Sequence, residues 1–155
     1  MAFFLYLPPL WKTRLTGGKA DRVRGKKHIL LVDDESDFRF SASVALRKAG
    51  YDVSEAENGL MALEKIVEAH NEGKAFSLLL TDIRMPMKSG MELLDDLQRD
   101  GIELPIIAIS NFPEKDLVAE LRARGCSEFI EKPFGPQELV ERVDTLLGGN
   151  LEDAG

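Results

Sequence analysis

The chain has 155 residues, of which 44% are hydrophobic and 30% are charged, and this suits one globular domain with short tails rather than a multidomain enzyme. The single cysteine, Cys126, excludes a disulfide framework, and two histidines leave no Cys/His zinc cluster. The formal net charge of −7 argues against nucleic-acid binding by the domain as a whole.

The charge is divided unevenly along the chain. Residues 1–27 contain seven Lys or Arg and one Asp, whereas residues 28–155 contain 13 Lys or Arg and 26 Asp or Glu. We therefore predict three parts: a basic N-terminal extension over residues 1–27, a domain over residues 28–147 and a C-terminal tail over residues 148–155.

The basic extension opens with an apolar run from Met1 to Trp11, which Pro8 and Pro9 interrupt. A membrane-spanning helix needs about 20 apolar residues, and a secretory signal places its basic residues first, so neither description fits. Two interpretations remain. The first is a disordered extension, which the lack of helical or strand periodicity favours. The second is a weak peripheral membrane anchor with its basic run on anionic lipid.

Short apolar runs alternate with amphipathic helical patterns from His28 onward. Three of the runs are apolar throughout, as strands buried between two helical layers require: 29–32, 78–80 and 106–109. Two others are typical of edge strands: 51–54 and 128–130. Each run precedes a helical pattern, and the order of five strand–helix repeats, (βα)₅, predicts an α/β fold with a doubly wound parallel sheet of five strands.

Two of the predicted helices carry local start signals. Ser89 and Glu92 have the spacing of a capping box, in which each side chain accepts a hydrogen bond from the backbone amide of the other. Pro136 occupies a favoured first position of the last helix.

Polar side chains follow the buried strands at the edge where parallel sheets bind ligands. The first strand ends in Asp33 and Asp34, the third in Asp82 and the fourth in Ser110, and Lys132 follows the fifth. Two carboxylates 4 Å apart repel each other by roughly 4 kcal/mol at an effective dielectric constant of about 20. A divalent cation that prefers oxygen ligands, such as Mg²⁺, would offset this repulsion. The alternative of three helix N-caps leaves the amine and the hydroxyl unexplained.

Four motifs in a fixed order carry a family resemblance: LVDDE at 31–35, TDIRMP at 81–86, AIS at 108–110 and FIEKPF at 129–134. Over residues 28–147 the chain resembles the receiver domain of two-component response regulators. The resemblance implies a flavodoxin-like fold with the strand order 2-1-3-4-5. It also implies phosphorelay signalling, in which an aspartate takes a phosphoryl group from the phosphohistidine of a sensor kinase with Mg²⁺ present.

The resemblance assigns the acidic residues of this sequence to phosphate and metal chemistry. It implies that Asp82 is the phosphoacceptor. Asp34, Asp82 and the backbone carbonyl of Arg84 would bind Mg²⁺ directly, and Asp33 would act through water.

The remaining motif residues would respond to the phosphoryl group. The resemblance implies that Lys132 neutralises one phosphoryl oxygen and that Ser110 hydrogen-bonds another. Phe129 would be the aromatic switch residue, and the surface of helix 4, strand 5 and helix 5 would change with it. The Lys132–Pro133 peptide is expected to be cis.

We therefore expect a signalling protein that catalyses only its own phosphorylation and dephosphorylation and is not otherwise an enzyme. The expected partners are a sensor histidine kinase or phosphotransfer protein as donor and a downstream protein as target. Only eight residues follow the last predicted helix, so we expect a stand-alone cytoplasmic domain, as a monomer or a phosphorylation-dependent dimer. The lifetime of the phosphoryl group stays open. Asn111 departs from the family pattern, and two residues lie at positions that tune this lifetime in the family: Arg84 and Phe112.

Two other classes of function fit the sequence less well. An aspartate-nucleophile phosphatase usually has a DxD motif after its first strand and a cap domain, and here the sequence after the first strand is DDESD with no room for a cap. A phosphorylation-independent interaction module is disfavoured because the set of acceptor residues is intact.

Overall fold

The computed structural model describes residues 26–111 and 115–148. Within these residues five strands alternate with five helices along the chain. The elements are β1 (His28–Val32), α3 (Ser36–Lys48), β2 (Asp52–Ala56), α4 (Gly59–Asn71), β3 (Leu78–Asp82), α5 (Gly90–Arg99), β4 (Ile106–Ser110), α6 (Lys115–Ala123), β5 (Glu128–Glu131) and α7 (Pro136–Leu147).

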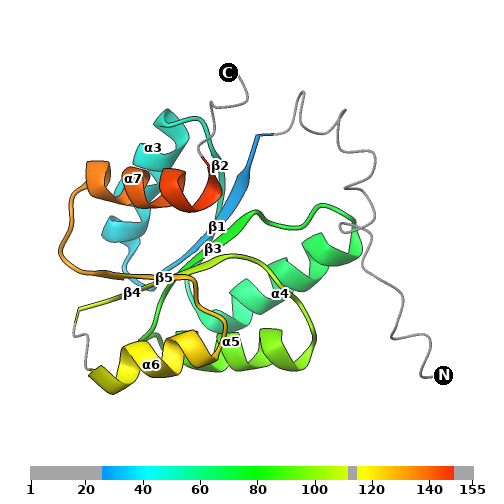
Figure 1. Cartoon of the computed structure of the whole chain (residues 1–155). Helices are drawn as coiled ribbons and strands as arrows, with labels where there is room; N and C mark the ends of the chain where they lie inside the picture. Colours follow the sequence, from blue (N-terminus) through cyan, green and yellow to red (C-terminus); the bar gives the residue numbers. More distant parts are fainter. Residues whose placement is uncertain (1–25, 112–114, 149–155) are drawn as a thin grey trace.

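The five strands form one parallel sheet in the order β2-β1-β3-β4-β5 (Figure 1). This is the flavodoxin-like α/β fold, and it confirms the predicted fold class and strand order. The three central strands, β1, β3 and β4, are the ones that the sequence predicted to be apolar on both faces, and their side chains are almost all buried.

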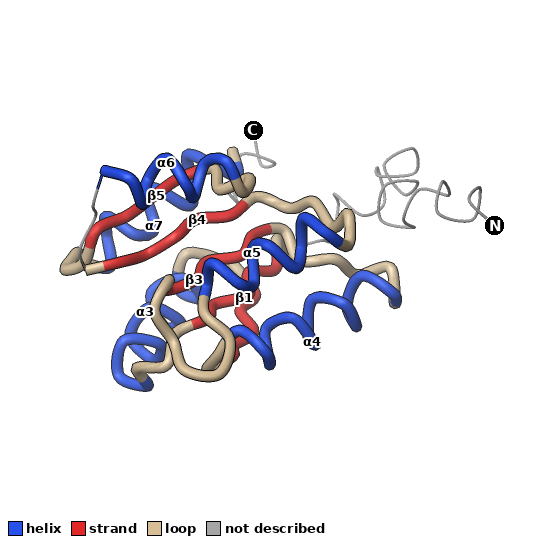
Figure 2. The backbone as a smooth tube through the Cα atoms, turned by 90° about the horizontal axis from the view of Figure 1, so that it is seen from below, coloured by secondary structure: helices blue, strands red, loops and turns tan. Residues whose placement is uncertain are grey.

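Helices cover both faces of the sheet (Figure 1), and Figure 2 looks onto the face with α4, α5 and α6 in front of the strands. Helices α3 and α7 cover one face, and α4, α5 and α6 cover the other. Side chains alternate along each strand. On β1, Leu30 and Val32 are therefore buried toward α4, α5 and α6, whereas Ile29 and Leu31 are buried toward α3 and α7. The sheet therefore separates two apolar cores.

Both predicted helix starts are confirmed. The hydroxyl of Ser89 accepts a hydrogen bond from the amide of Glu92 at 3.2 Å, and the Glu92 carboxylate accepts one from the amide of Ser89 at 2.9 Å. Pro136 is the first residue of α7. These signals act within a few residues, so the sequence alone was enough to locate them.

The second strand lies slightly later than predicted. Its pairing with β1 runs from Asp52 to Ala56, because the end of β1 at Val32 pairs with Ala56. Tyr51, predicted to open this strand, instead lies buried before it and donates a hydrogen bond from its hydroxyl to Asp144 of α7.

No helix among the described residues is both long and apolar enough to cross a membrane. The two interpretations concern the basic extension over residues 1–27, of which residues 1–25 lie outside the described part of the chain.

Candidate functional site

Three carboxylates meet at the carboxyl edge of the sheet. Asp33 follows β1, Asp82 is the last residue of β3, and the two strands are neighbours with Val32 opposite Thr81. One oxygen from each of Asp33, Asp34 and Asp82 lies within 4.8 Å of the others. Asp33 is fully buried, whereas Asp34 is exposed, so the cluster opens to solvent on one side.

The carboxylate of Asp82 is oriented by the backbone that follows it. Its Oδ1 accepts a hydrogen bond from the amide of Ile83 at 2.7 Å, and the amide nitrogen of Arg84 lies 3.4 Å from the same oxygen. Burial, followed by the charge of Asp33, raises the pKa of Asp82 from 3.8 to about 6. Asp82 is thus ionised at neutral pH in an environment that disfavours its charge.

Lys132 brings one positive charge to the three carboxylates. Its backbone amide donates to the carbonyl of Ser110 at 2.8 Å, which holds the end of β5 beside the end of β4. Its ammonium nitrogen, Nζ, lies 3.0 Å from Asp33 Oδ2 and 4.0 Å from Asp82 Oδ2. Burial lowers the pKa of Lys132, but its hydrogen bonds and the nearby carboxylates outweigh burial and raise that pKa above its ordinary value.

For Asp33, burial outweighs the hydrogen bonds and nearby charges in setting the pKa. Burial raises the pKa of Asp33 above its ordinary value, and the hydrogen bonds from the Glu35 amide and from Lys132 only partly offset this effect. The backbone around it is fixed as well, because the Arg39 guanidinium donates to the carbonyl oxygen of Asp33 at 2.6 Å.

This donor set fits a hard divalent cation. All three side chains offer carboxylate oxygens, the ligands that Mg²⁺ prefers, and the exposed side of the cluster leaves room for water ligands. Their mutual repulsion, which contributes to the raised pKa of Asp82, is the electrostatic signature of a site that a cation would stabilise. The arrangement is consistent with the predicted Mg²⁺ site.

The other predicted site residues lie at different depths. Ser110 ends β4 and is buried, next to the backbone of Lys132. Arg84 is exposed in the loop after β3. The Lys132–Pro133 peptide is cis, as expected from the resemblance.

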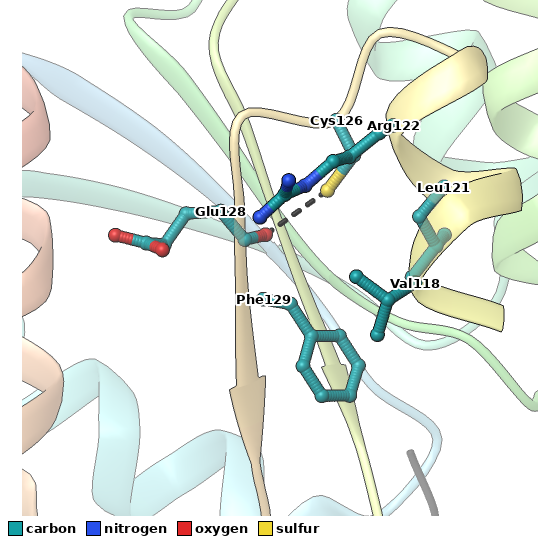
Figure 3. A pocket seen from close by; sticks show the side chains of 6 residues that line it. All are labelled: Val118, Leu121, Arg122, Cys126, Glu128 and Phe129. Carbon is teal, nitrogen blue, oxygen red and sulfur yellow. Dashed lines mark hydrogen bonds between the residues drawn. The ribbon is translucent and has the colours of Figure 1, made fainter. Parts of the chain in front are cut away.

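Phe129 is the second residue of β5, and its side chain faces α6. Its ring lines a pocket of about 190 Å³ together with Val118 and Leu121 of α6 (Figure 3). The Cys126 thiol closes another side of this pocket and donates a hydrogen bond to the carbonyl of Glu128 at 3.0 Å. Burial raises the pKa of this thiol, so Cys126 is a packed thiol rather than a reactive thiolate.

Three residues near Lys132 were not singled out from the sequence. Glu35 accepts a hydrogen bond from Lys132 Nζ at 3.1 Å, and the ring of Phe38 lies with its centroid 4.2 Å from the same nitrogen. Phe134 packs edge-on against Phe38, with 5.6 Å between the ring centroids. Only the position of Glu35 directly after Asp33 and Asp34 could have pointed to it.

Comparison with known proteins gives the same family as the resemblance of the sequence motifs. The family model of the response regulator receiver domain matches residues 29–144. The chain is 39% identical over 123 residues to the phosphate regulon transcriptional regulatory protein PhoB of Pseudomonas aeruginosa, covering 78% of this chain and 52% of PhoB. It thus spans about half the length of that relative.

Single-domain relatives match over almost their whole length. The chain is 38% identical over 125 residues to the chemotaxis protein CheY1 of Helicobacter pylori, covering 79% of this chain and 98% of CheY1. The crystal structure of a CheY-like response regulator receiver domain protein from Methanospirillum hungatei superposes with a TM-score of 0.72 at 28% identity, covering 84% of this chain and all of that one.

The family match spans the sheet, the carboxylate cluster and Lys132, and the relatives agree with it in fold and sequence. Residues 29–144 therefore form a response regulator receiver domain, and the chain belongs to this family of phosphorelay signalling proteins rather than to a class of enzymes.

Proposed function

We propose that the chain receives a phosphoryl group on Asp82 from a histidine kinase or a phosphotransfer protein in the cytoplasm and passes the signal to a partner protein. The observation that carries this proposal is the placement of Asp82, which lies beside two further carboxylates and the half-buried Lys132 at the open edge of the sheet. A nucleophile, oxygen ligands for a cation and a positive charge are the three parts that phosphoryl transfer needs.

The two oxygens of Asp82 have different surroundings. Oδ1 is held by the amide of Ile83, whereas Oδ2 is the oxygen that faces Lys132. We expect Oδ2 to attack the phosphorus atom. The new Oδ2–P bond forms as the bond from phosphorus to the donor atom breaks, and the donor leaves with the electrons of that bond. The carboxylate is ionised at neutral pH, so no general base is needed.

The residues that would hold Mg²⁺ are Asp34, Asp82 and the backbone carbonyl of Arg84, with Asp33 acting through water. When bound, Mg²⁺ supplies the positive charge that lets a carboxylate approach an anionic phosphoryl group. Lys132 would add its own charge near Asp82 Oδ2, and Ser110 at the end of β4 would supply a hydroxyl donor. These groups stabilise the added charge without taking part in bond making.

The signal would leave the site through β5. Ser110 and Lys132 are joined by a backbone hydrogen bond, so a displacement of Ser110 toward the phosphoryl group acts on the end of β5. Phe129 lies on the same strand and lines the pocket against α6. Movement of its ring would change the surface formed by α6, β5 and α7, and a partner that prefers the changed surface would then bind.

Intact-mass spectrometry tests this proposal. The protein is incubated with acetyl phosphate, a small phosphodonor, with Mg²⁺ or with a chelator, beside an Asp82→Asn variant. We expect one phosphoryl adduct on the unmodified protein with Mg²⁺, and none with the chelator or on the variant. An adduct of equal yield on the variant would overturn the assignment of Asp82.

A further inference from the structure

Lys132 is engaged with partners other than the phosphoacceptor. Its Nζ donates to Asp33 Oδ2 at 3.0 Å and to Glu35 Oε1 at 3.1 Å, but it lies 4.0 Å from Asp82 Oδ2, beyond hydrogen-bond range. The single charge of Lys132 is therefore committed to two carboxylates before any phosphoryl group arrives.

These two carboxylates differ in their access to water. The Asp33 side chain is fully buried, so losing its lysine would leave a buried charge without its partner. The Glu35 side chain is 66% exposed, so water can replace the lysine at its oxygens. Breaking the hydrogen bond from Lys132 to Glu35 therefore costs less free energy than breaking the one to Asp33.

The reach of Glu35 is set by the backbone around it. Its amide donates to Asp33 Oδ1 at 2.8 Å, and it is the N-cap residue of α3, yet its side chain makes no capping hydrogen bond. The carboxylate instead extends across the site to Lys132, the residue that follows β5. On another side the centroid of the Phe38 ring lies 4.2 Å from Nζ, a contact that favours the charged form of the amine.

We propose that Glu35 is a positioning residue that holds Lys132 away from Asp82 in the unphosphorylated protein and competes with the phosphoryl group for its ammonium. This rests on the proposed function of Asp82. A phosphoryl group adds strong anionic acceptor oxygens next to Lys132. Glu35 then releases the ammonium and turns its carboxylate into water, while Asp33 stays in place.

Beryllofluoride, an anion that mimics a phosphoryl group on a carboxylate, tests this competition at saturating Mg²⁺. Its affinity is measured for the unmodified protein, for Glu35→Gln and for Asp37→Asn. Asp37 is exposed and lies in the first turn of the same helix, so its variant removes an equal charge close by. We expect Glu35→Gln to bind beryllofluoride about twofold to fivefold more tightly, the range of an exposed ion pair, and Asp37→Asn to bind as the unmodified protein does.

A spectroscopic readout separates positioning from a general effect on the fold. The ammonium group of Lys132 is observed by ¹⁵N–¹H NMR in all three proteins without beryllofluoride. We expect its signal to shift in Glu35→Gln, toward the position that beryllofluoride produces in the unmodified protein, and to stay unchanged in Asp37→Asn.

The outcomes distinguish the competition from the function on which it rests. Failure of the unmodified protein to bind beryllofluoride would overturn the proposed function, and the competition with it. Binding of equal strength by the unmodified protein and Glu35→Gln would overturn the competition alone. Weaker binding by Glu35→Gln would also overturn it, because Glu35 would then support Lys132 in its phosphate-binding position.

Discussion

The charge of Asp82 opposes folding and favours ligand binding at the same residue. Burial and the charge of Asp33 raise the pKa of Asp82 from 3.8 to about 6, so the folded protein binds this proton more tightly than the unfolded chain does. The ionised carboxylate therefore destabilises the folded state. This penalty is fully present above about pH 6 and disappears as the pH falls toward 3.8.

We predict that Asp82→Asn increases the free energy of unfolding at pH 7.5 without Mg²⁺, by on the order of 1–2 kcal/mol, because the amide carries no charge into the site. The increase should shrink as the pH is lowered to 4.5, where Asp82 of the folded protein is protonated. Urea unfolding at the two pH values measures it, with Asp37→Asn as a control for the loss of an exposed charge. An increase of the same size at both pH values would contradict this account.

At the scale of elements, the connection from β3 to α5 holds Asp82 in place. The amide of Gly90, the first residue of α5, donates to the carbonyl of Ile83 at 2.9 Å. A Cβ atom at Gly90 would lie 2.4 Å from the carbonyl oxygen of Asp82 and 2.9 Å from the Cα of Ile83. Both are backbone atoms, so a side chain here must displace the end of the strand that carries Asp82.

We predict that Gly90→Ala lowers the free energy of unfolding by more than about 1 kcal/mol and weakens Mg²⁺ binding, because the substitution overpacks the turn behind Asp82. The matched control is Gly135→Ala at the N-cap of α7, where the added Cβ meets nothing within 4 Å. The control should lose only the modest N-cap preference for glycine over alanine and should bind Mg²⁺ normally. Titration calorimetry measures the Mg²⁺ affinity of both variants, and urea unfolding measures their free energy of unfolding. Equal Mg²⁺ affinities would contradict the account that the turn at Gly90 positions Asp82.

Local chemistry explains which elements were predictable from the sequence. The capping box at Ser89 depends on residues three positions apart, and the polar strand ends follow directly from the order of apolar runs, so both could be predicted. The ion pair between Lys88 and the buried Asp96 could not, because Asp96 falls in an acidic stretch that is typical of a solvated helix face. The structure instead places Lys88 Nζ 2.5 Å from its carboxylate, and this bond lowers the pKa of Asp96.

The contact between Glu35 and Lys132 was unpredictable for a different reason. The two residues are 97 positions apart, and their contact depends on the rotamer of an exposed side chain rather than on the order of elements. Sequence patterns bring strand ends to one edge of the sheet, but they do not say which carboxylate the lysine chooses there.

At the scale of the whole molecule, the helices differ in how firmly they are attached. Helices α4 and α5 pack along each other, as do α3 and α7. Among the described residues α6 packs less closely on other elements, and the Gln98 side chain of α5 donates a hydrogen bond to its Ala123 carbonyl at 3.2 Å. Helix α6 also borders the pocket that Phe129 lines. Looser packing on its neighbours and an adjacent cavity predict a lower local stability for α6 than for α5.

We predict that backbone amides of α6 exchange with solvent at least tenfold faster than those of α5 in the unphosphorylated protein. Beryllofluoride with Mg²⁺ should slow exchange in α6 and β5, because the proposed movement of Phe129 repacks this surface. Hydrogen exchange followed by NMR measures both effects at single amides. Equal protection of α6 and α5, or a response confined to the carboxylate cluster, would show that the signal does not travel through β5.

The central claim is that the phosphoryl group resides on Asp82, and the most direct measurement locates it chemically. After reaction with acetyl phosphate and Mg²⁺, borohydride reduces the acyl phosphate and converts the modified aspartate to homoserine, which tandem mass spectrometry places in the sequence. We predict homoserine at position 82 and at no other position. Homoserine at position 34 or 33 with an unchanged residue at position 82 would contradict the account.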